Sequence, residues 1–325
     1  MGKKAIIVVL TFALAGILLM GCSSGGEADA PEPAPEPAPG PAQAEASGDS
    51  GIAVTDMEGR EVRLGAPATR VVALMPADVE ILYAIGAGDT LVGRGEYCNY
   101  PPEALEAPSV QSGNDANFEQ IIALEPQLLL ISKVAHDESL IGQFESAGVA
   151  IFVTDAQDID GTYAAIEMLG KLVGKEAEAG AVVEEMSEVF AELHDKAAAA
   201  GGEQKTIYFE VSPLEFGLWA AGDETFMNEV AELIGLRNIF GDVPSWSEVS
   251  EEQVLERNPD YIMTVGMYFG DGPTPIESIL SRPGWESITA VKNEAIINLT
   301  EDELSRPGPR LALGARILYE FVYGA

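Results

Sequence analysis

Two glutamates occupy the same position in two copies of one local sequence pattern. The first copy begins at Asn117 and reads NFEQIIALEPQLLLI, and the second begins at Ser250 and reads SEEQVLERNPDYIMTV. Glu119 and Glu252 are therefore in register, 133 residues apart. Each copy predicts a helix capped by Asn117 or Ser250, with a capping box completed by the glutamine three residues later. Such carboxylates stabilise a helix start by about 0.3–1 kcal/mol, but a matched pair can also dock on a two-fold symmetric partner that presents one basic site twice.

Aromatic side chains gather in segments that we expect to be loops: Tyr97, Tyr100, Phe216, Trp219, Trp246, Tyr268 and Phe269. Ligand pockets favour aromatic walls with a few polar groups, and they often lie between domains. Because aromatic residues are usually buried, core packing is the competing interpretation for about half of them. From this group we expect Tyr97, Tyr100, Trp219 and Trp246 to contact a ligand.

The sequence carries none of the common catalytic motifs. It lacks the phosphate-binding GxxxxGK[ST], the metalloprotease HExxH, the GxSxG elbow and CxxC. Its only histidines are His136 and His194, too few for a transition-metal site built on several histidines. Nothing singles out one pair among its 53 acidic residues for acid–base work. We therefore expect no enzymatic turnover, no cofactor and no metal-ligating residues of the protein itself.

The amino terminus has the pattern of an export signal. Lys3 and Lys4 precede an apolar run over 5–20, which is short for a membrane span of about 20 residues. The run ends in Leu19-Met20-Gly21-Cys22, which resembles the lipobox of bacterial lipoproteins and implies cleavage and acylation of Cys22. A plain export signal or a short anchor helix is the alternative. Residues 23–50, rich in Pro, Ala and Glu, favour extended conformations and predict a spacer that holds the folded part away from the membrane.

Composition narrows the possible partners. The formal net charge of −35 repels nucleic acid and anionic lipid, and no basic stripe offsets it. We therefore expect contact with the membrane through the lipid anchor alone. With Cys22 acylated, Cys98 is the only thiol left, and we expect it to be a small buried residue.

The order of elements predicts alternating strands and helices on both sides of one long helix. Strands are expected near 70–74, 90–93, 128–132 and 149–154, and again near 205–211, 261–265 and 295–299, with a hairpin over 52–64. Between the two sets, residues 175–200 contain no proline and place apolar residues at helical spacing, which predicts a helix of about 39 Å. We expect two α/β lobes joined by this helix, with a ligand cleft between them.

The predicted domain boundaries follow from these segments. They are a signal peptide over 1–21, Cys22 and the linker over 22–50, lobes over 51–174 and 201–325, and the connecting helix over 175–200.

Several motifs together resemble the cobalamin- and iron-complex-binding proteins of ABC importers. They are Glu96-Tyr-Cys-Asn-Tyr-Pro-Pro, the pattern from Asn117, Val249-Ser-Glu-Glu-Gln-Val-Leu and Ser305-Arg-Pro-Gly-Pro-Arg310. The similarity covers roughly residues 52–325. It implies a cleft for a large metal chelate, with Tyr97 and Asp302 at positions that contact the ligand in cobalamin binders. Gly113 stands where those binders have a cleft Trp, so haem, a ferric siderophore and cobalamin all stay open as ligands.

The resemblance also implies partners. In that family, a pair of glutamates on the two lobes meets arginines of the permease dimer, and the matching positions here are Glu119 and Glu252. We thus expect a lipid-anchored, extracytoplasmic solute-binding protein that serves an ABC importer and its ATPase. The alternative is an exported hydrolase that uses carboxylates in the same cleft.

Overall fold

The computed structural model describes residues 51–113, 116–133, 138–212, 214–265, 272–299 and 302–324. These residues belong to one compact unit that spans 49–325. The predicted signal peptide, Cys22 and the linker lie outside the described residues, as do Tyr268, Phe269 and His136. Within the described ranges, no helix combines the length and the apolar character needed to cross a membrane.

The first half of the unit is built on a parallel sheet. A hairpin precedes it: β1 (Ile52–Thr55) pairs antiparallel with β2 (Glu61–Leu64), as the sequence predicts. The sheet has the strand order β5-β4-β3-β6-β7, and all its pairings are parallel. Its strands are β3 (Val71–Ala73), β4 (Leu91–Gly95), β5 (Ser109–Val110), β6 (Leu128–Ser132) and β7 (Ala150–Thr154). The helices of this half are α1 (Pro76–Ala84), α2 (Phe118–Ile122), α3 (Glu138–Ser146) and α4 (Ile159–Val173).

The second half repeats this plan around a mixed sheet with the order β11-β9-β8-β12-β13, in which β10 also pairs with β8. The strands are β8 (Thr206–Ser212), β9 (Trp219–Ala221), β10 (Arg237–Asn238), β11 (Trp246–Glu248), β12 (Tyr261–Thr264) and β13 (Ile296–Asn298). The helices are α6 (Phe226–Leu233), α7 (Glu251–Arg257), α8 (Pro275–Leu280), α9 (Thr289–Lys292) and α10 (Leu311–Tyr323). The pairings of β8, β12 and β13 are parallel, whereas β9 pairs antiparallel with both β8 and β11.

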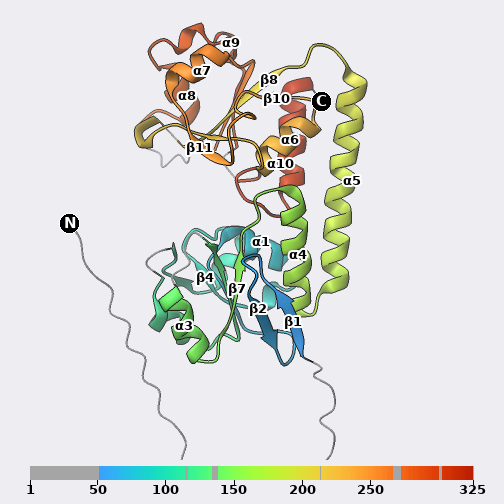
Figure 1. Cartoon of the computed structure of the whole chain (residues 1–325), viewed down its shortest axis with the longest axis vertical. Coiled ribbons are helices and arrows are strands. Elements are labelled where there is room, and N and C mark those ends of the chain that lie inside the picture. Colours follow the sequence, from blue (N-terminus) through green and yellow to red (C-terminus); the bar gives the residue numbers. More distant parts are fainter. Residues whose placement is uncertain are drawn as a thin grey trace, which may run out of the picture. The chain divides into compact units, whose positions relative to one another are not determined.

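A single long helix, α5 (Glu176–Ala200), connects the two halves within one residue of its predicted bounds. Its buried residues Ala179, Met186, Phe190, Leu193 and Ala197 form a stripe at helical spacing. That stripe faces α4 and α10, which lie along α5 in Figure 1. One apolar core therefore continues from the first half through α5 into the second.

Four strands, β5, β9, β10 and β11, were not expected. We predicted loops at Trp219 and Trp246, but β9 and β11 place them on paired strands in which Trp219 lies opposite Glu248 and Trp246 opposite Ala221. Each of these two strands is only three residues long and is stabilised by a partner about 25 residues away. Such short runs carry no alternation that a sequence pattern can detect, because the pairing that forms them is not local.

Candidate ligand-binding site

A cavity of about 560 Å³ lies at the carboxyl edge of the first sheet. Residues that follow β3, β6 and β7 line it together with the start of α1. The carboxyl ends of parallel strands meet at one edge, and the strand order reverses at β3, because β4 and β5 lie on one side of it and β6 and β7 on the other. Open α/β sheets bind their ligands at such a switch point, so the topology alone favours a site here.

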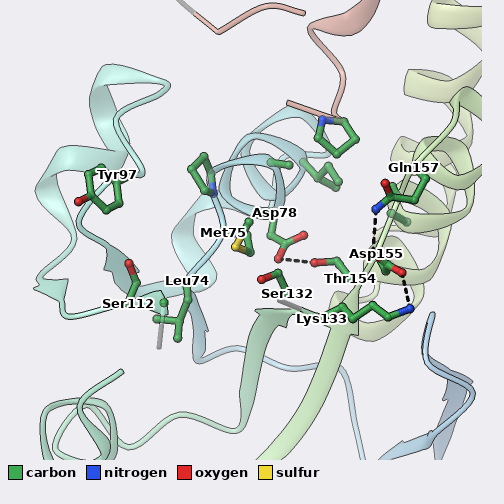
Figure 2. Close-up of a pocket in the computed structure, with 17 residues that line it drawn as sticks. Leu74, Met75, Asp78, Tyr97, Ser112, Ser132, Lys133, Thr154, Asp155 and Gln157 are labelled. Atoms are coloured by element: carbon green, nitrogen blue, oxygen red, sulfur yellow. Dashed lines mark hydrogen bonds and ion pairs between the residues drawn. The ribbon is translucent and has the colours of Figure 1, made fainter. Parts of the chain in front are cut away.

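The wall of the cavity is mostly apolar, with one exposed aromatic ring. Leu74, Met75, Pro76, Ala77 and Ile81 contribute apolar surface from the end of β3 and the start of α1. Tyr97 follows β4 and is 65% exposed, although most tyrosines are at least half buried. Figure 2 shows Tyr97 and Ser112 on one side of the cavity, with Lys133 and Gln157 on the other. An apolar wall with a few convergent polar groups is typical of a small-molecule site.

One carboxyl group sits buried at this wall. Asp78, in the first turn of α1, is 1% exposed and accepts a hydrogen bond of 3.1 Å from the Thr154 hydroxyl (Figure 2). Burial raises the pKa of Asp78 to about 7, and the bond from Thr154 only partly opposes this. The group therefore changes charge near neutral pH, directly beside the cavity.

A chain of polar contacts crosses the opposite wall. Lys133 forms ion pairs with Glu58 at 2.8 Å and with Asp155 at 3.1 Å. Gln157 donates to Asp155 at 2.8 Å and accepts from the Trp246 indole N–H at 2.8 Å. The predicted residue Trp246 thus does not line the cavity itself. It is half-buried against Phe226 and holds the side chain of a wall residue from the other half of the unit.

Three predicted residues, Tyr97, Tyr100 and Asp302, are brought together by two arginines. Arg306 pairs with Asp302 and donates to the Tyr97 carbonyl at 3.4 Å. The Arg310 guanidinium stacks over the Tyr100 ring, with 3.9 Å from its central carbon to the ring centroid. Tyr100 and Asp302 are not among the residues that line the cavity, although each contacts one of these arginines.

Both arginines converge on Glu80, a buried residue of α1. Arg306 donates to Glu80 Oε1 at 2.8 Å, and Arg310 donates to both carboxylate oxygens at 2.7 and 2.8 Å. Because the arginines precede α10 and Glu80 lies in α1, this network connects the two halves of the unit. Pro307, between the arginines, lines the cavity, so the network fixes part of its wall.

Trp219 remains apart from the cavity. It is 39% exposed on β9 and is not one of the lining residues. The pairing of β9 with β11 puts it on the same face of the sheet as Trp246, two residue pairs along. Gly113 does line the cavity, with a positive φ of 69°.

Glu119 and Glu252 are both exposed, at the second position of α2 and of α7. In the second copy the predicted capping box is complete, because Ser250 and Gln253 exchange both hydrogen bonds. In the first copy the Asn117 cap is present, but the prediction of a box was wrong. The Gln120 side chain accepts from the Gln111 N–H at 3.2 Å instead, since a neighbouring loop offers it that donor.

Cys98 is a fully buried free thiol, as predicted. Burial raises its pKa to about 12, so it stays protonated. Among the described residues, no cluster of three or more His, Cys, Asp or Glu side chains is arranged to hold a metal ion.

Asp78, Gln157 and Glu80 were not predicted as site residues. Asp78 and Glu80 stand in the segment Met75-Pro-Ala-Asp-Val-Glu, which reads as an ordinary helix start with acidic residues. The one available signal was position, because polar residues that follow an apolar strand of a parallel sheet lie at the ligand-binding edge.

Comparisons with known proteins show which family this chain resembles. A family model described as "Periplasmic binding protein" matches residues 71–303. The uncharacterized ABC transporter substrate-binding lipoprotein YvrC of Bacillus subtilis is 31% identical over 99% of this chain and 98% of its own. The vitamin B12-binding protein of Photorhabdus laumondii is 30% identical over 77% of this chain and 86% of its own.

A solved structure from Staphylococcus epidermidis, described as a possible iron-binding (periplasmic solute-binding) protein, is also similar. It is 30% identical, has a TM-score of 0.68, and the match covers 79% of this chain and all of that one.

Proposed function

The chain belongs to the periplasmic binding protein family, and on that premise we propose that it captures a chelated metal ion outside the cytoplasm and delivers it to an ABC importer. The relatives described as binding vitamin B12 and iron support this ligand class, which includes corrinoids, haem and ferric siderophores. We propose binding and release without chemical change.

The observation that carries the proposal is the cavity at the carboxyl edge of the first sheet. Its volume of about 560 Å³ falls within the range of small-molecule pockets, and its wall combines apolar side chains with the exposed ring of Tyr97. An exposed aromatic ring that lines a cavity offers a stacking or packing surface to a bulky ligand.

Calorimetric titration of the full-length protein in detergent with cobalamin, hemin and ferric siderophores tests this function. We expect one ligand per protein, recovered unchanged after release. Tyr97→Ala should weaken binding by about 1.5–3 kcal/mol, the contribution of one large apolar side chain. Tyr319→Ala is the matched control, because Tyr319 stacks on Tyr323 at the end of α10 and does not line the cavity. Equal affinity in both variants would remove Tyr97 from the site, and an altered ligand would contradict a pure binding function.

The anchor and the docking surface complete the proposal. Acylation of Cys22 would hold the protein at the membrane, so Cys22→Ser should release it into the soluble fraction. Glu119 and Glu252, exposed in the two halves, would each meet a basic residue of the permease dimer. The alternative of an exported hydrolase has no support in the relatives named above, which are all described as binding proteins.

A further inference from the structure

The charged side chains that line the cavity carry an excess of carboxylates. Lys133 is the one cation among the described lining residues, and Asp78 and Asp155 are the anions. Lys133 is already paired with both Asp155 and Glu58, and these hydrogen bonds raise its pKa. Its charge is therefore neutralised within the protein, whereas Asp78 has only the Thr154 hydroxyl as its described polar contact.

The arginines close to the cavity are also engaged by carboxylates. Arg306 pairs with Glu80 and Asp302, and Arg310 pairs with Glu80 through two hydrogen bonds. Arg94, on β4, does not line the cavity, and its guanidinium donates to the Gly95 carbonyl at 3.1 Å. An anionic ligand that recruited Arg306 or Arg310 would have to break an ion pair that fixes the cavity wall.

Within residues 51–325, the segments outside the described ranges add no permanent cation. The segments of residues 51–325 that lie outside the described ranges contain no lysine and no arginine. Their acidic residues are Asp115, Asp137, Asp271 and Glu301, and His136 is their single histidine. Whatever positions these segments take, they cannot supply a guanidinium or ammonium group.

We propose that the cavity selects metal chelates of zero or positive net charge and discriminates against polyanionic ones, with Asp78 as a determinant of this preference. The inference rests on the proposed function and narrows its ligand class. An anion buried here would lose its hydration and meet carboxylates instead of cations, which is the repulsive element that specificity requires. A neutral complex avoids this cost, and a cationic complex gains attraction.

Asp78 makes the preference depend on pH. Its pKa of about 7 means that its carboxyl becomes ionised as the pH rises through neutrality, so attraction for a cationic chelate should increase. The groups that face it from neighbouring elements keep their charge in this range: the Cys98 thiol has a pKa of about 12, and Lys133 is held cationic by its acidic partners. The other charged groups close to Cys98 are Arg94 and Arg306, and Arg306 is paired with Glu80 and Asp302.

Binding titrations with four probes test the selection by charge. The full-length protein is titrated with cyanocobalamin (neutral), ferrioxamine B (a cationic hydroxamate complex), hemin (which carries two carboxylates) and a ferric catecholate complex (polyanionic). We expect a neutral or cationic probe to bind at least about tenfold more tightly than either anionic probe. Tightest binding of hemin or the catecholate would overturn the charge inference and leave the proposed function standing. Binding of no chelate would overturn the proposed function and the inference with it.

A second arm isolates Asp78. Affinity for the cationic probe should rise several-fold from about pH 6 to about pH 8 in the native chain, while affinity for cyanocobalamin stays nearly constant. Asp78→Asn keeps the shape of the side chain and should abolish the rise. Asp89→Asn, which removes one exposed carboxylate elsewhere in the first half, is the matched control and should preserve it. A rise that persists in Asp78→Asn would contradict the role of Asp78.

Discussion

The two halves of this protein bury a carboxyl group at comparable places and treat it differently. Asp78 follows β3, the central strand of the first sheet, and Glu210 lies near the end of β8, the central strand of the second. Glu210 accepts two hydrogen bonds from Arg282, at 2.6 and 2.8 Å, and Arg282 stacks over Trp285. Burial raises the pKa of both carboxyl groups, that of Asp78 to about 7, but Asp78 has a hydroxyl partner in place of an arginine.

Because their partners differ, the two buried acids have different roles: Glu210 packs in a core, whereas Asp78 lies beside the binding cavity. In the second half the arginine fills the space beside the carboxylate, so this polar pair becomes part of a closed core. In the first half the space beside the carboxyl is the cavity, and a ligand rather than an arginine would complete it. A buried acid without a cation is energetically unfavourable at high pH, and such groups are concentrated at functional sites.

Removal of Arg282 should cause the largest loss of stability. Arg282→Ala leaves Glu210 buried without a counter-charge, and we expect a loss of about 3–5 kcal/mol in the free energy of unfolding, measured with urea. The double variant Arg282→Met with Glu210→Met is the control and should recover much of that loss, because apolar residues of similar size can replace a buried pair. A loss below about 1 kcal/mol in the single variant would mean that water compensates Glu210 and that the halves do not differ.

Asp78→Asn should instead raise the free energy of unfolding, and the size of this increase should depend on pH. The folded-state pKa of Asp78 lies above its unfolded value, so this group lowers stability progressively as the pH rises from about 4 to about 7, and the penalty is full above 7. A shift from 3.8 to about 7 corresponds to a penalty of up to about 4 kcal/mol. Asp78→Asn should therefore be more stable than the native chain at pH 8 and similar near pH 4, as measured by urea unfolding at both values. A constant difference between the two proteins at all pH values would argue against a raised pKa.

Glu80→Gln tests the network of Glu80, Arg306 and Arg310 that joins the halves. We expect its effect on stability to be smaller than those of the two variants above. The amide cannot offset the charges of Arg306 and Arg310, so we expect a loss of about 1.5–3 kcal/mol in unfolding free energy and weaker ligand binding, since Pro307 lines the cavity. The matched control is Glu61→Gln, which breaks an exposed pair with Arg63 and should change stability by less than about 1 kcal/mol. Equal losses in the two variants would assign the network no special part in joining the halves.

Charge reversal at the matched glutamates should have the smallest effect on stability. Glu119→Lys and Glu252→Lys each remove a favourable charge at a helix start and should cost about 0.3–1 kcal/mol. Ligand affinity should stay unchanged, but ligand-stimulated ATP hydrolysis by the reconstituted importer should fall in each variant and be lost in the double variant. Glu256→Lys, an exposed reversal at the other end of α7, is the control. Normal stimulation by the double variant would leave the two glutamates as helix-start residues.

Local sequence patterns predicted most of the fold. The hairpin at 52–64, β6 and α5 were predicted nearly to their ends, because strand alternation and helical spacing are properties of neighbouring residues. Sequence patterns also singled out Tyr97, which lines the cavity, and Glu119 and Glu252, which are exposed. They could not predict β9 and β11, whose pairing joins distant residues.

The sequence by itself determined the acidic character, the long connecting helix and the absence of any lysine or arginine from those segments of residues 51–325 that lie outside the described ranges. Only the tertiary structure decided which charges remain uncompensated at the cavity. Arg282, Arg306 and Arg310 each reach a carboxylate more than 70 positions away, whereas Asp78 is buried beside Thr154 with no such partner among the described residues. The reason is physical: burial and charge pairing depend on what surrounds a side chain in three dimensions, and the chain folds distant residues into that environment.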